Sequence, residues 1–171
     1  MYDNTPTTSD LSHLSEELKA KAMKVLGRSL AVREVDAGSC NACEVEVNAL
    51  SNPVYDIERL GVHIVASPRH ADLLLVTGPV TRNMEFPLIK TYMAMPEPRI
   101  VAAMGVCAIS GGMFKGSYCC HKGVAEVLPV DVYIPGCPPR PQAIIQGIME
   151  ALNMMEGKRQ TDPPRGILPR P

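Results

Sequence analysis

The chain has 171 residues, of which 46% are apolar and 20% charged, and its formal net charge is −1. This size suits one ordinary globular domain with short appendages, and so weak a charge gives no electrostatic basis for binding nucleic acid. No apolar run approaches the roughly 20 residues of a membrane-spanning helix, and the polar N-terminus lacks the pattern of a signal peptide, so we expect a cytoplasmic protein.

Residues 1–30 are predicted to form a polar N-terminal segment followed by an amphipathic helix. Ser9 or Asp10 can serve as the N-cap of this helix and Gly27 as its stop. The apolar residues that recur at helical spacing are Leu11, Leu14, Leu18, Ala22 and Val25. This apolar stripe can pack on the domain, on a partner subunit or on a membrane surface, and the mixed charges of the opposite face favour the first two.

Residues 31–156 are predicted to form an α/β domain. Short β-branched apolar runs occupy residues 29–35, 62–66, 72–77, 99–104 and 130–134. Helical patterns occupy residues 43–51, 83–95 and 140–155. Because continuous apolar runs are typical of parallel strands covered on both faces, we predict an open, mainly parallel sheet with helices on both faces, in a flavodoxin-like arrangement with right-handed crossovers.

Residues 157–171 carry four prolines and are predicted to form an extended, proline-rich C-terminal arm. The helix before the arm is accordingly expected to end near Gly157. Such an arm more often binds a neighbouring chain or stays disordered than joins a core.

Four of the six cysteines follow predicted strands. Cys40 and Cys43 follow the first strand, Cys107 the fourth and Cys137 the fifth, each in a turn. The carboxyl ends of parallel strands meet at one edge of a sheet, where such folds place their ligands, so we expect these four thiols to form one site. In a chain without an export signal, six cysteines indicate metal or redox chemistry rather than a disulfide framework.

Four thiolates select soft metals, which leaves two kinds of site open, an iron–sulfur cluster and a structural zinc ion. Structural zinc sites usually pair two short C-x-x-C motifs, whereas here one such motif joins two solitary cysteines. This pattern favours an iron–sulfur cluster. Gly38, Gly105 and Gly136 precede the cysteines, permit a tight approach and leave backbone N–H groups free to point at sulfur.

Cys119 and Cys120 lie outside the strand-end loops. Adjacent residues in extended backbone point in opposite directions, so we expect one packed and one partly exposed thiol here. A second metal site built from Cys119, Cys120 and His121 is the less favoured interpretation, since no further ligand at a suitable spacing is present.

Four motifs resemble a known family over residues 31 to about 152. They are G-S-C-N-A-C-E, S-P-R-H-A-D-L-L-L-V-T-G-P-V-T, G-V-C-A-I-S-G-G and V-D-V-Y-I-P-G-C-P-P. They resemble the family that unites the 20 kDa subunit of respiratory complex I with the small subunits of nickel–iron hydrogenases. The resemblance implies one 4Fe-4S cluster on Cys40, Cys43, Cys107 and Cys137, next to the active site of a large partner subunit.

The first motif separates the branches of this family. Complex I members have adjacent cysteines there, whereas this chain has the C-x-x-C spacing of hydrogenases. The chain also lacks the long cysteine-bearing extension of ordinary hydrogenase small subunits. It is thus most similar to the small subunits of membrane-bound, energy-converting hydrogenases of the formate hydrogenlyase type.

The resemblance implies an electron-transfer subunit, not catalytic alone, that exchanges electrons with a nickel–iron site in the hydrogenase-type large subunit during proton reduction or hydrogen oxidation. A ferredoxin-like iron–sulfur subunit and membrane subunits are the other implied partners. They would hold the chain peripherally on the inner face of the cell membrane.

The alternatives are the corresponding cluster subunit of a complex I-like NADH- or ferredoxin-linked quinone oxidoreductase and a zinc-stabilised interaction module. A flavodoxin-like FMN binder is disfavoured, because the first loop carries cysteines instead of a hydroxyl-rich phosphate cradle.

Charged residues near the cysteines complete the predicted site. Glu44 follows Cys43 and resembles a carboxylate on the proton path of hydrogenases. Burial would favour the protonated form of Glu44 that a proton relay needs. The alternative is that Glu44, in the first turn of a helix, only complements the helix dipole. Arg69, His70 and Arg82 follow the second and third strands, and we expect them either to raise the cluster potential or to remain solvated.

Overall fold

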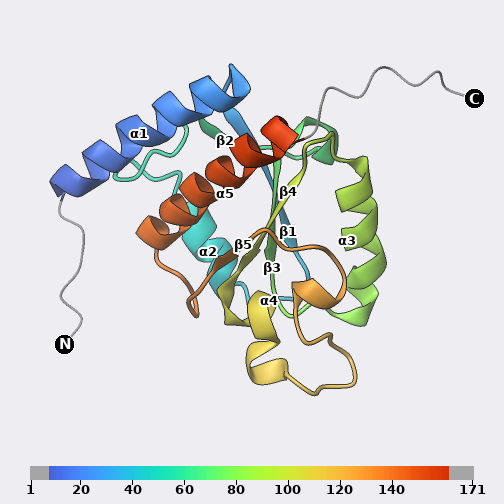
Figure 1. The fold of residues 1–171 in the computed structure, drawn as a ribbon. Helices are drawn as coiled ribbons and strands as arrows, with labels where there is room; N and C mark the ends of the chain where they lie inside the picture. Colours follow the sequence, from blue (N-terminus) through green and yellow to red (C-terminus); the bar gives the residue numbers. More distant parts are fainter. Residues whose placement is uncertain (1–7, 162–171) are drawn as a thin grey trace, which may run out of the picture.

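A computed structural model describes residues 8–161, with side chains described for residues 16–158. In this part of the chain five parallel strands form one sheet in the order β2-β1-β3-β4-β5 (Figure 1). The strands are β1 Leu30–Asp36, β2 Val62–Ile64, β3 Leu73–Thr77, β4 Ile100–Met104 and β5 Val132–Ile134. The predicted parallel sheet is confirmed, and its order is that of the flavodoxin-like doubly wound fold.

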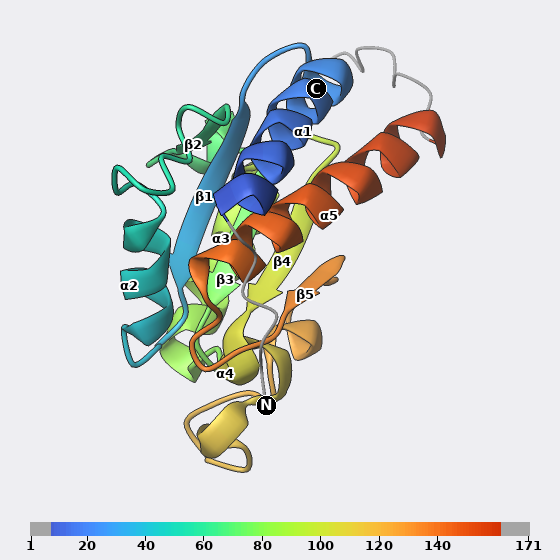
Figure 2. The same cartoon turned by 90° about the vertical axis from the view of Figure 1, so that its left-hand side faces the viewer.

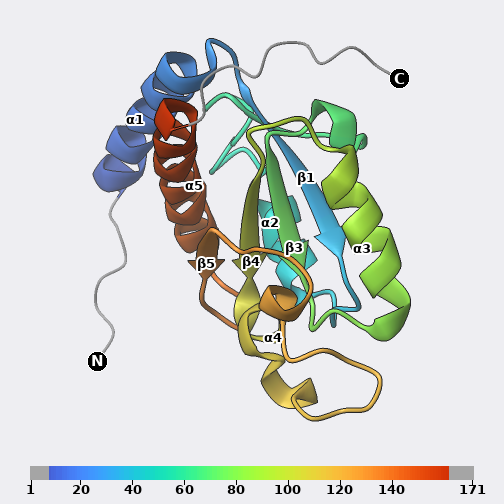
Figure 3. The same ribbon diagram turned by 45° about the vertical axis from the view of Figure 1, so that its right-hand side comes forward.

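The sheet is covered on both faces by helices, as predicted. The helices are α1 Thr8–Leu26, α2 Ala42–Ala49, α3 Arg82–Ala94, α4 Gly105–Ser110 and α5 Pro141–Thr161, with single 3-10 turns η1 Pro68–His70, η2 Gly112–Phe114 and η3 Val124–Glu126. Figure 3 shows α1 and α5 on one side of the sheet and α3 on the other. Successive residues of a strand face opposite sides, and both sides of β3 are apolar and buried.

The two faces of β3 belong to two separate hydrophobic cores. Leu73 and Leu75 pack in the core that also contains residues of α1, α2 and α5. Leu74 and Val76 pack in the second core, with residues of α3 and α4. This two-sided burial explains why the strand reads as an uninterrupted apolar run in the sequence.

Helix α1 packs on the domain itself, next to α5 (Figure 2). Leu18, Ala22 and Val25 of its apolar stripe are buried in the core, so this part of the stripe packs on the domain rather than on a partner or a membrane. The side chains of Leu11 and Leu14 fall outside the described residues. The predicted N-cap is wrong, because Ser9 and Asp10 already lie inside the helix. Gly27 ends it as predicted, with φ +69° and its N–H donating to the carbonyl of Met23 at 2.9 Å.

Helix α5 is longer than predicted. It continues through Gly157 to Thr161, so the first five residues of the predicted arm are helical. The prolines that stop a helix begin only at Pro163, and Lys158 ties this last part of α5 to the domain, with its Nζ 2.7 Å from Asp131 Oδ1. The rest of the predicted arm lies outside the described residues.

Within residues 8–161, none of the helices combines the length and the apolarity that a membrane span requires.

Candidate metal centre

The four predicted ligands lie at the carboxyl end of the sheet. Cys40 is in the loop between β1 and α2, Cys43 is the second residue of α2, Cys107 is the third residue of α4, and Cys137 is in the loop between β5 and α5. Figure 1 shows these loops and α4 together below the strand ends. Cys107 therefore sits in a short helix that the sequence did not predict, rather than in a turn.

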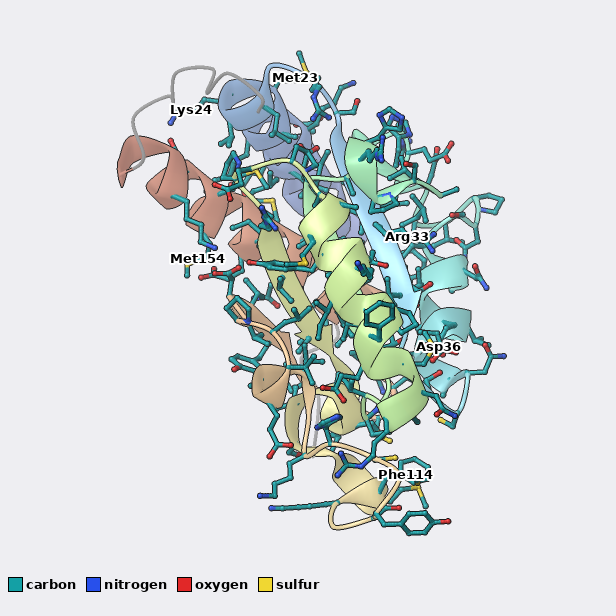
Figure 4. The ribbon with its side chains drawn as sticks, turned by 90° about the vertical axis from the view of Figure 1, so that its right-hand side faces the viewer. Met23, Lys24, Arg33, Asp36, Phe114 and Met154 are labelled. Atoms are coloured by element: carbon teal, nitrogen blue, oxygen red, sulfur yellow. The ribbon has the colours of Figure 1, made fainter. Side chains whose placement is uncertain are left out.

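The Cys40 loop is shaped by the residues before it. The carboxylate of Asp36 accepts hydrogen bonds from the N–H groups of Gly38 and Ser39, at 2.8 and 2.7 Å. The hydroxyl of Ser39 accepts one from the N–H of Asn41 at 3.0 Å. Such short-range bonds are typical of aspartate and serine in turns, and here they hold the loop between β1 and α2 (Figure 4 labels Asp36).

Backbone contacts join the other cysteine loops. The N–H of Val106, at the start of α4, donates to the carbonyl of Gly136 at 2.8 Å, which joins α4 to the Cys137 loop. The Cys43 Sγ lies 4.0 Å from the carbonyl oxygen of Met104, at the end of β4. The three loops are thus in contact at one place.

Two glycines make room for sulfur at this place. A Cβ added to Gly105 would lie 2.7 Å from Cys43 Sγ, and one added to Gly112 would lie 3.0 Å from Cys107 Sγ. Both glycines also have positive φ angles, which L side chains rarely adopt. The predicted close approach at Gly105 is confirmed, and Gly112 is an addition that the G-G pair after Cys107 could have suggested.

The four thiols influence one another electrostatically. Burial raises the pKa of Cys43 to about 12, and the charges of Glu44, Cys40, Cys107 and Cys137 add to this increase. Burial also raises the pKa of Cys107, again with contributions from Cys137 and Cys40. Thiols in this arrangement ionise together only when a bound cation compensates their charge.

The donor set fits an iron–sulfur cluster. Among the described residues, no three histidine, cysteine, aspartate or glutamate side chains converge closely enough for a single metal ion. In a cubane each thiolate binds a different iron, so four ligands need not converge on one point. Four sulfur donors at one end of the sheet, with glycines where a side chain would displace them, match what such a group requires.

The centre is open to solvent on one side. Cys40 and Cys137 are exposed, whereas Cys43 and Cys107 are partly buried. Exposed apolar side chains follow in α4 and the next loop, where Met113 is 86% and Tyr118 is 91% exposed. Figure 4 shows the neighbouring Phe114 at this end of the molecule, far from Met23 and Lys24 of α1 at the other end.

Two carboxyl groups lie behind Cys43, between α2 and the sheet. Both carboxylate oxygens of Glu44 are buried, and neither has a hydrogen-bond partner among the described residues. Glu34 of β1 accepts a hydrogen bond from the hydroxyl of Thr77 at 3.2 Å. Burial raises the pKa of Glu34, the Thr77 hydrogen bond opposes this, and the charge of Glu44 adds to the increase.

Sequence reasoning missed Glu34. The available signal is its position two and four residues after Val32 and Leu30, two buried apolar residues that share its face of the strand. A charged residue on a covered sheet face is unusual, and it indicates a polar function or a polar neighbour.

The predicted tuning residues do not lie together. Arg69 and His70 are exposed in η1, before the amino end of β3, and the five residues of β3 at about 3.3 Å each separate them from the cysteine end. Their exposed position agrees with the second of the two expectations, that they remain solvated. Arg82 does lie at the cysteine end, where its Nε donates to the carbonyl of Tyr118 at 2.9 Å.

Cys119 and Cys120 differ from prediction in their orientation. Their sulfur atoms are 3.6 Å apart instead of pointing in opposite directions. Cys119 is exposed and Cys120 partly buried, as expected of the pair. The suggested second metal site with His121 is not present, because His121 Nε2 hydrogen-bonds to Glu85 at 3.0 Å and the described residues contain no such ligand group.

Comparison with known proteins agrees with the motifs. The family described as NADH ubiquinone oxidoreductase, 20 Kd subunit, matches residues 40–151. Formate hydrogenlyase subunit 7 of Escherichia coli is 46% identical over 153 residues, which are 90% of this chain and 59% of that protein. The chain therefore spans well under two thirds of that relative.

Two further curated relatives cover more of their own length. The probable membrane-bound hydrogenase subunit mbhJ of Pyrococcus furiosus is 47% identical over 82% of this chain and 84% of that protein. An NADH-quinone oxidoreductase subunit of Carboxydothermus hydrogenoformans is 48% identical over 68% of this chain and 71% of that protein. By these names, the relatives are subunits of hydrogenase and of NADH-quinone oxidoreductase complexes.

Solved structures share the fold. A chain of the membrane-bound sulfane sulfur reductase, an archaeal respiratory membrane complex, is 36% identical with a TM-score of 0.68, over 84% of this chain and 78% of that one. A chain of the [NiFeSe] hydrogenase of Desulfovibrio vulgaris Hildenborough has a TM-score of 0.57 at 19% identity, over 78% of this chain and 62% of that one, and it shows the fold alone. The predicted resemblance is confirmed, and the chain belongs to the NADH ubiquinone oxidoreductase 20 Kd subunit family.

Proposed function

We propose that this chain is an electron-transfer subunit with a single 4Fe-4S cluster on Cys40, Cys43, Cys107 and Cys137. It would exchange electrons with the nickel–iron site of a large partner subunit in a membrane-bound hydrogenase complex. The observation that carries the proposal is the gathering of these four thiols, from three strand-end loops, at one end of the sheet. The relatives named as formate hydrogenlyase and membrane-bound hydrogenase subunits support it.

When bound, the cluster supplies one-electron redox chemistry, and the chain sets the conditions for it. The four cysteines hold the irons. Gly105 and Gly112 keep Cβ atoms away from the sulfur atoms of Cys43 and Cys107. Partial burial of these two cysteines lowers the local dielectric, which is one of the factors that tune such a cluster.

The exposed rim of the site suits a large partner. Val106, Met113 and Tyr118 are exposed apolar side chains in α4 and the loop that follows it. Surface of this kind beside a redox site is typical of a protein interface. We assign it to the hydrogenase-type large subunit, with a ferredoxin-like subunit and membrane subunits completing a complex on the inner face of the cell membrane.

We further propose that Glu44 relays protons between this chain and the large subunit. Its two buried oxygens without partners among the described residues support this role, because both are free to hydrogen-bond to an incoming polar group. In the complex, a carboxylate oxygen of Glu44 would accept a proton, and the resulting carboxyl group would donate it toward the partner.

The cluster is tested by anaerobic purification of the whole chain with measurement of iron, sulfide and zinc. We expect about four irons and four sulfides per chain, in keeping with one cubane, and a brown protein. The Cys137→Ala variant should lose most of the charge-transfer absorbance, whereas Cys119→Ser should keep it. If the purified chain contains zinc in place of iron, and the Cys137→Ala variant has the same absorbance spectrum as the original chain, the chain is a zinc-stabilised interaction module instead.

The relay is tested in the complex by replacing Glu44 with glutamine. The cluster absorbance should stay the same, while hydrogen production at saturating electron supply should fall roughly tenfold or more, because a general acid–base group typically contributes at least that factor. Glu46→Gln, in the same helix, is the matched control and should keep the original rate. An unchanged rate in Glu44→Gln would reject the relay.

One alternative has an observation in its favour. The 48% identity to an NADH-quinone oxidoreductase subunit makes a quinone-linked complex the second candidate. The C-x-x-C spacing of Cys40 and Cys43 favours the hydrogenase. Nickel analysis of the large subunit that copurifies with this chain distinguishes the two, since a quinone-linked complex would contain none.

A further inference from the structure

The loop that carries Cys119 and Cys120 is held in place on both sides of the pair. The N–H of Arg82 donates to the carbonyl of Cys119 at 2.9 Å, and the N–H of His121 donates to the carbonyl of Val80 at 3.0 Å. An isolated antiparallel bridge also pairs Thr81 with Cys120. The two thiols are therefore presented by ordered backbone at the start of α3.

Both thiols face the same small volume. Their sulfur atoms are 3.6 Å apart, and the hydroxyl of Ser117 lies 3.0 Å from Cys119 Sγ. Cys119 is exposed, and Cys120 is partly buried. In the chain by itself a reagent from solution can thus reach Cys119, and Cys120 can reach any sulfur that is attached there.

The surroundings make the two thiols chemically different. The hydrogen bond from Ser117 lowers the pKa of Cys119, and Cys120 and the positive charge of Arg82 act in the same direction. Burial raises the pKa of Cys120, and its neighbour Cys119 adds to this increase. An accessible thiol that ionises more readily than the less exposed thiol beside it is the arrangement of a nucleophilic and a resolving cysteine.

We propose that Cys119 and Cys120 form a thiol–disulfide exchange site for small disulfides of the glutathione type, separate from the metal centre. The Cys119 thiolate attacks one sulfur of the disulfide and displaces one small thiolate, which gives a mixed disulfide. Cys120, after losing its proton to that thiolate, attacks Cys119 Sγ and displaces the second one. The pair loses two electrons and two protons, and the small disulfide becomes two thiols, the second of which takes up from solvent the proton that Cys119 released on ionising.

The product is easily reversed. Consecutive Cα atoms are about 3.8 Å apart, below the roughly 4.4–6.8 Å of ordinary disulfides, so a bond between adjacent cysteines is strained. A strained disulfide has a more oxidising potential and is readily reduced. The site therefore responds to the ratio of small disulfide to small thiol around it.

The sequence makes a clean experiment possible. Trypsin cleaves after Lys115 and Lys122 and releases residues 116–122, which contain this pair and none of the proposed cluster ligands. The cluster-loaded chain is treated anaerobically with glutathione disulfide, the remaining thiols are alkylated, and this peptide is measured by mass spectrometry. The absorbance of the cluster is followed in parallel, so loss of the cluster is recorded independently.

We expect the peptide of the original chain to lose two hydrogens and to carry no glutathione. Cys120→Ser should accumulate one glutathione on Cys119, and Cys119→Ser should react about tenfold more slowly, because its remaining thiol is less exposed and less ionised. Ser117→Ala should slow the reaction several-fold near neutral pH and shift its pH profile to higher pH. The effect should be partial, because Cys120 and Arg82 still lower the pKa of Cys119. A peptide with two glutathiones, a fast Cys119→Ser reaction, or no reaction in the original chain would overturn the proposal.

Discussion

At the scale of single residues, polar groups on covered surfaces distinguish this chain from an ordinary α/β domain. Glu34 stands on the face of β1 that carries Leu30 and Val32, and the charge that acts on it most strongly is that of the Glu44 carboxyl group. Two carboxyl groups in partial burial cost stability when both are ionised. The burial of the Glu44 oxygens without a hydrogen-bond partner among the described residues is the observation on which the proposed relay rests.

Glu34 leads to a prediction about pH. Its folded-state pKa lies above the ordinary value of 4.5, so the folded chain binds its proton more tightly than the unfolded chain does. Stability should consequently fall as pH rises from 4.5 through the raised pKa. The Glu34→Gln variant should lose less stability over this pH range, and at neutral pH it should unfold at a higher urea concentration than the original chain. Urea unfolding of the cluster-loaded chain at a series of pH values from 4.5 upward measures this, and parallel curves of stability against pH for both proteins would contradict it.

At the scale of elements, the short helix α4 places Cys107 next to the loop that carries Cys137. It begins directly at the end of β4, and Gly105 at its first position turns the chain with φ +88° beneath Cys43. Helix α2 begins in a similar way after a left-handed Asn41, with φ +69°. Both cysteine-bearing helices thus start from backbone conformations that few residues adopt.

Gly105 and Gly116 form a matched pair for testing α4. Both have φ near +85°, at +88° and +85°, but a Cβ on Gly105 would crowd Cys43 Sγ, whereas one on Gly116 would meet nothing within 4 Å. Gly105→Ala should therefore lower the iron content and destabilise the chain by about 2–3 kcal/mol.

Gly116→Ala should cost only the conformational term, about 1–2 kcal/mol, with the cluster retained. Iron analysis and urea unfolding of both variants provide the comparison. Equal iron losses in the two variants would show that crowding at Cys43 is not what matters.

At the scale of the whole molecule, one ion pair connects the N-terminal part to the middle of the sheet. Arg28, just after α1, donates two hydrogen bonds to the carboxylate of Asp72, at 2.9 and 2.7 Å, and the N–H of Ala31 donates a third at 3.1 Å. Asp72 is buried and directly precedes β3. The pair therefore fixes α1 and the start of β1 against the amino end of β3, opposite the metal centre.

Asp72→Ala should destabilise the whole domain by about 3 kcal/mol, because it removes three hydrogen bonds and leaves the N–H of Ala31 without this acceptor. The cluster spectrum should not change, since the pair lies at the other end of the strands. Glu97→Ala is the control, because its exposed carboxylate pairs with Arg99 at the surface and should contribute less than about 1 kcal/mol. The midpoints of urea unfolding test both values.

The sequence by itself determined the strands, the parallel sheet, both helical coverings and the four cysteines of the candidate centre. These follow from local patterns, namely apolar runs of strand length, helical spacing, and cysteines directly after strands. Residue motifs also sufficed to identify the family, because each motif is contiguous in the chain.

Only the tertiary structure decided the features that depend on distant contacts. Beyond the predicted end of helix α5, Lys158 pairs with Asp131, and at the start of the helix that holds Cys107 the N–H of Val106 donates to the carbonyl of Gly136. The sulfurs of Cys119 and Cys120 lie together because the start of α3 holds their loop by backbone bonds. The shortest of these separations in sequence is that between Asp131 and Lys158, which are 27 positions apart. Local sequence patterns do not encode contacts between residues so far apart.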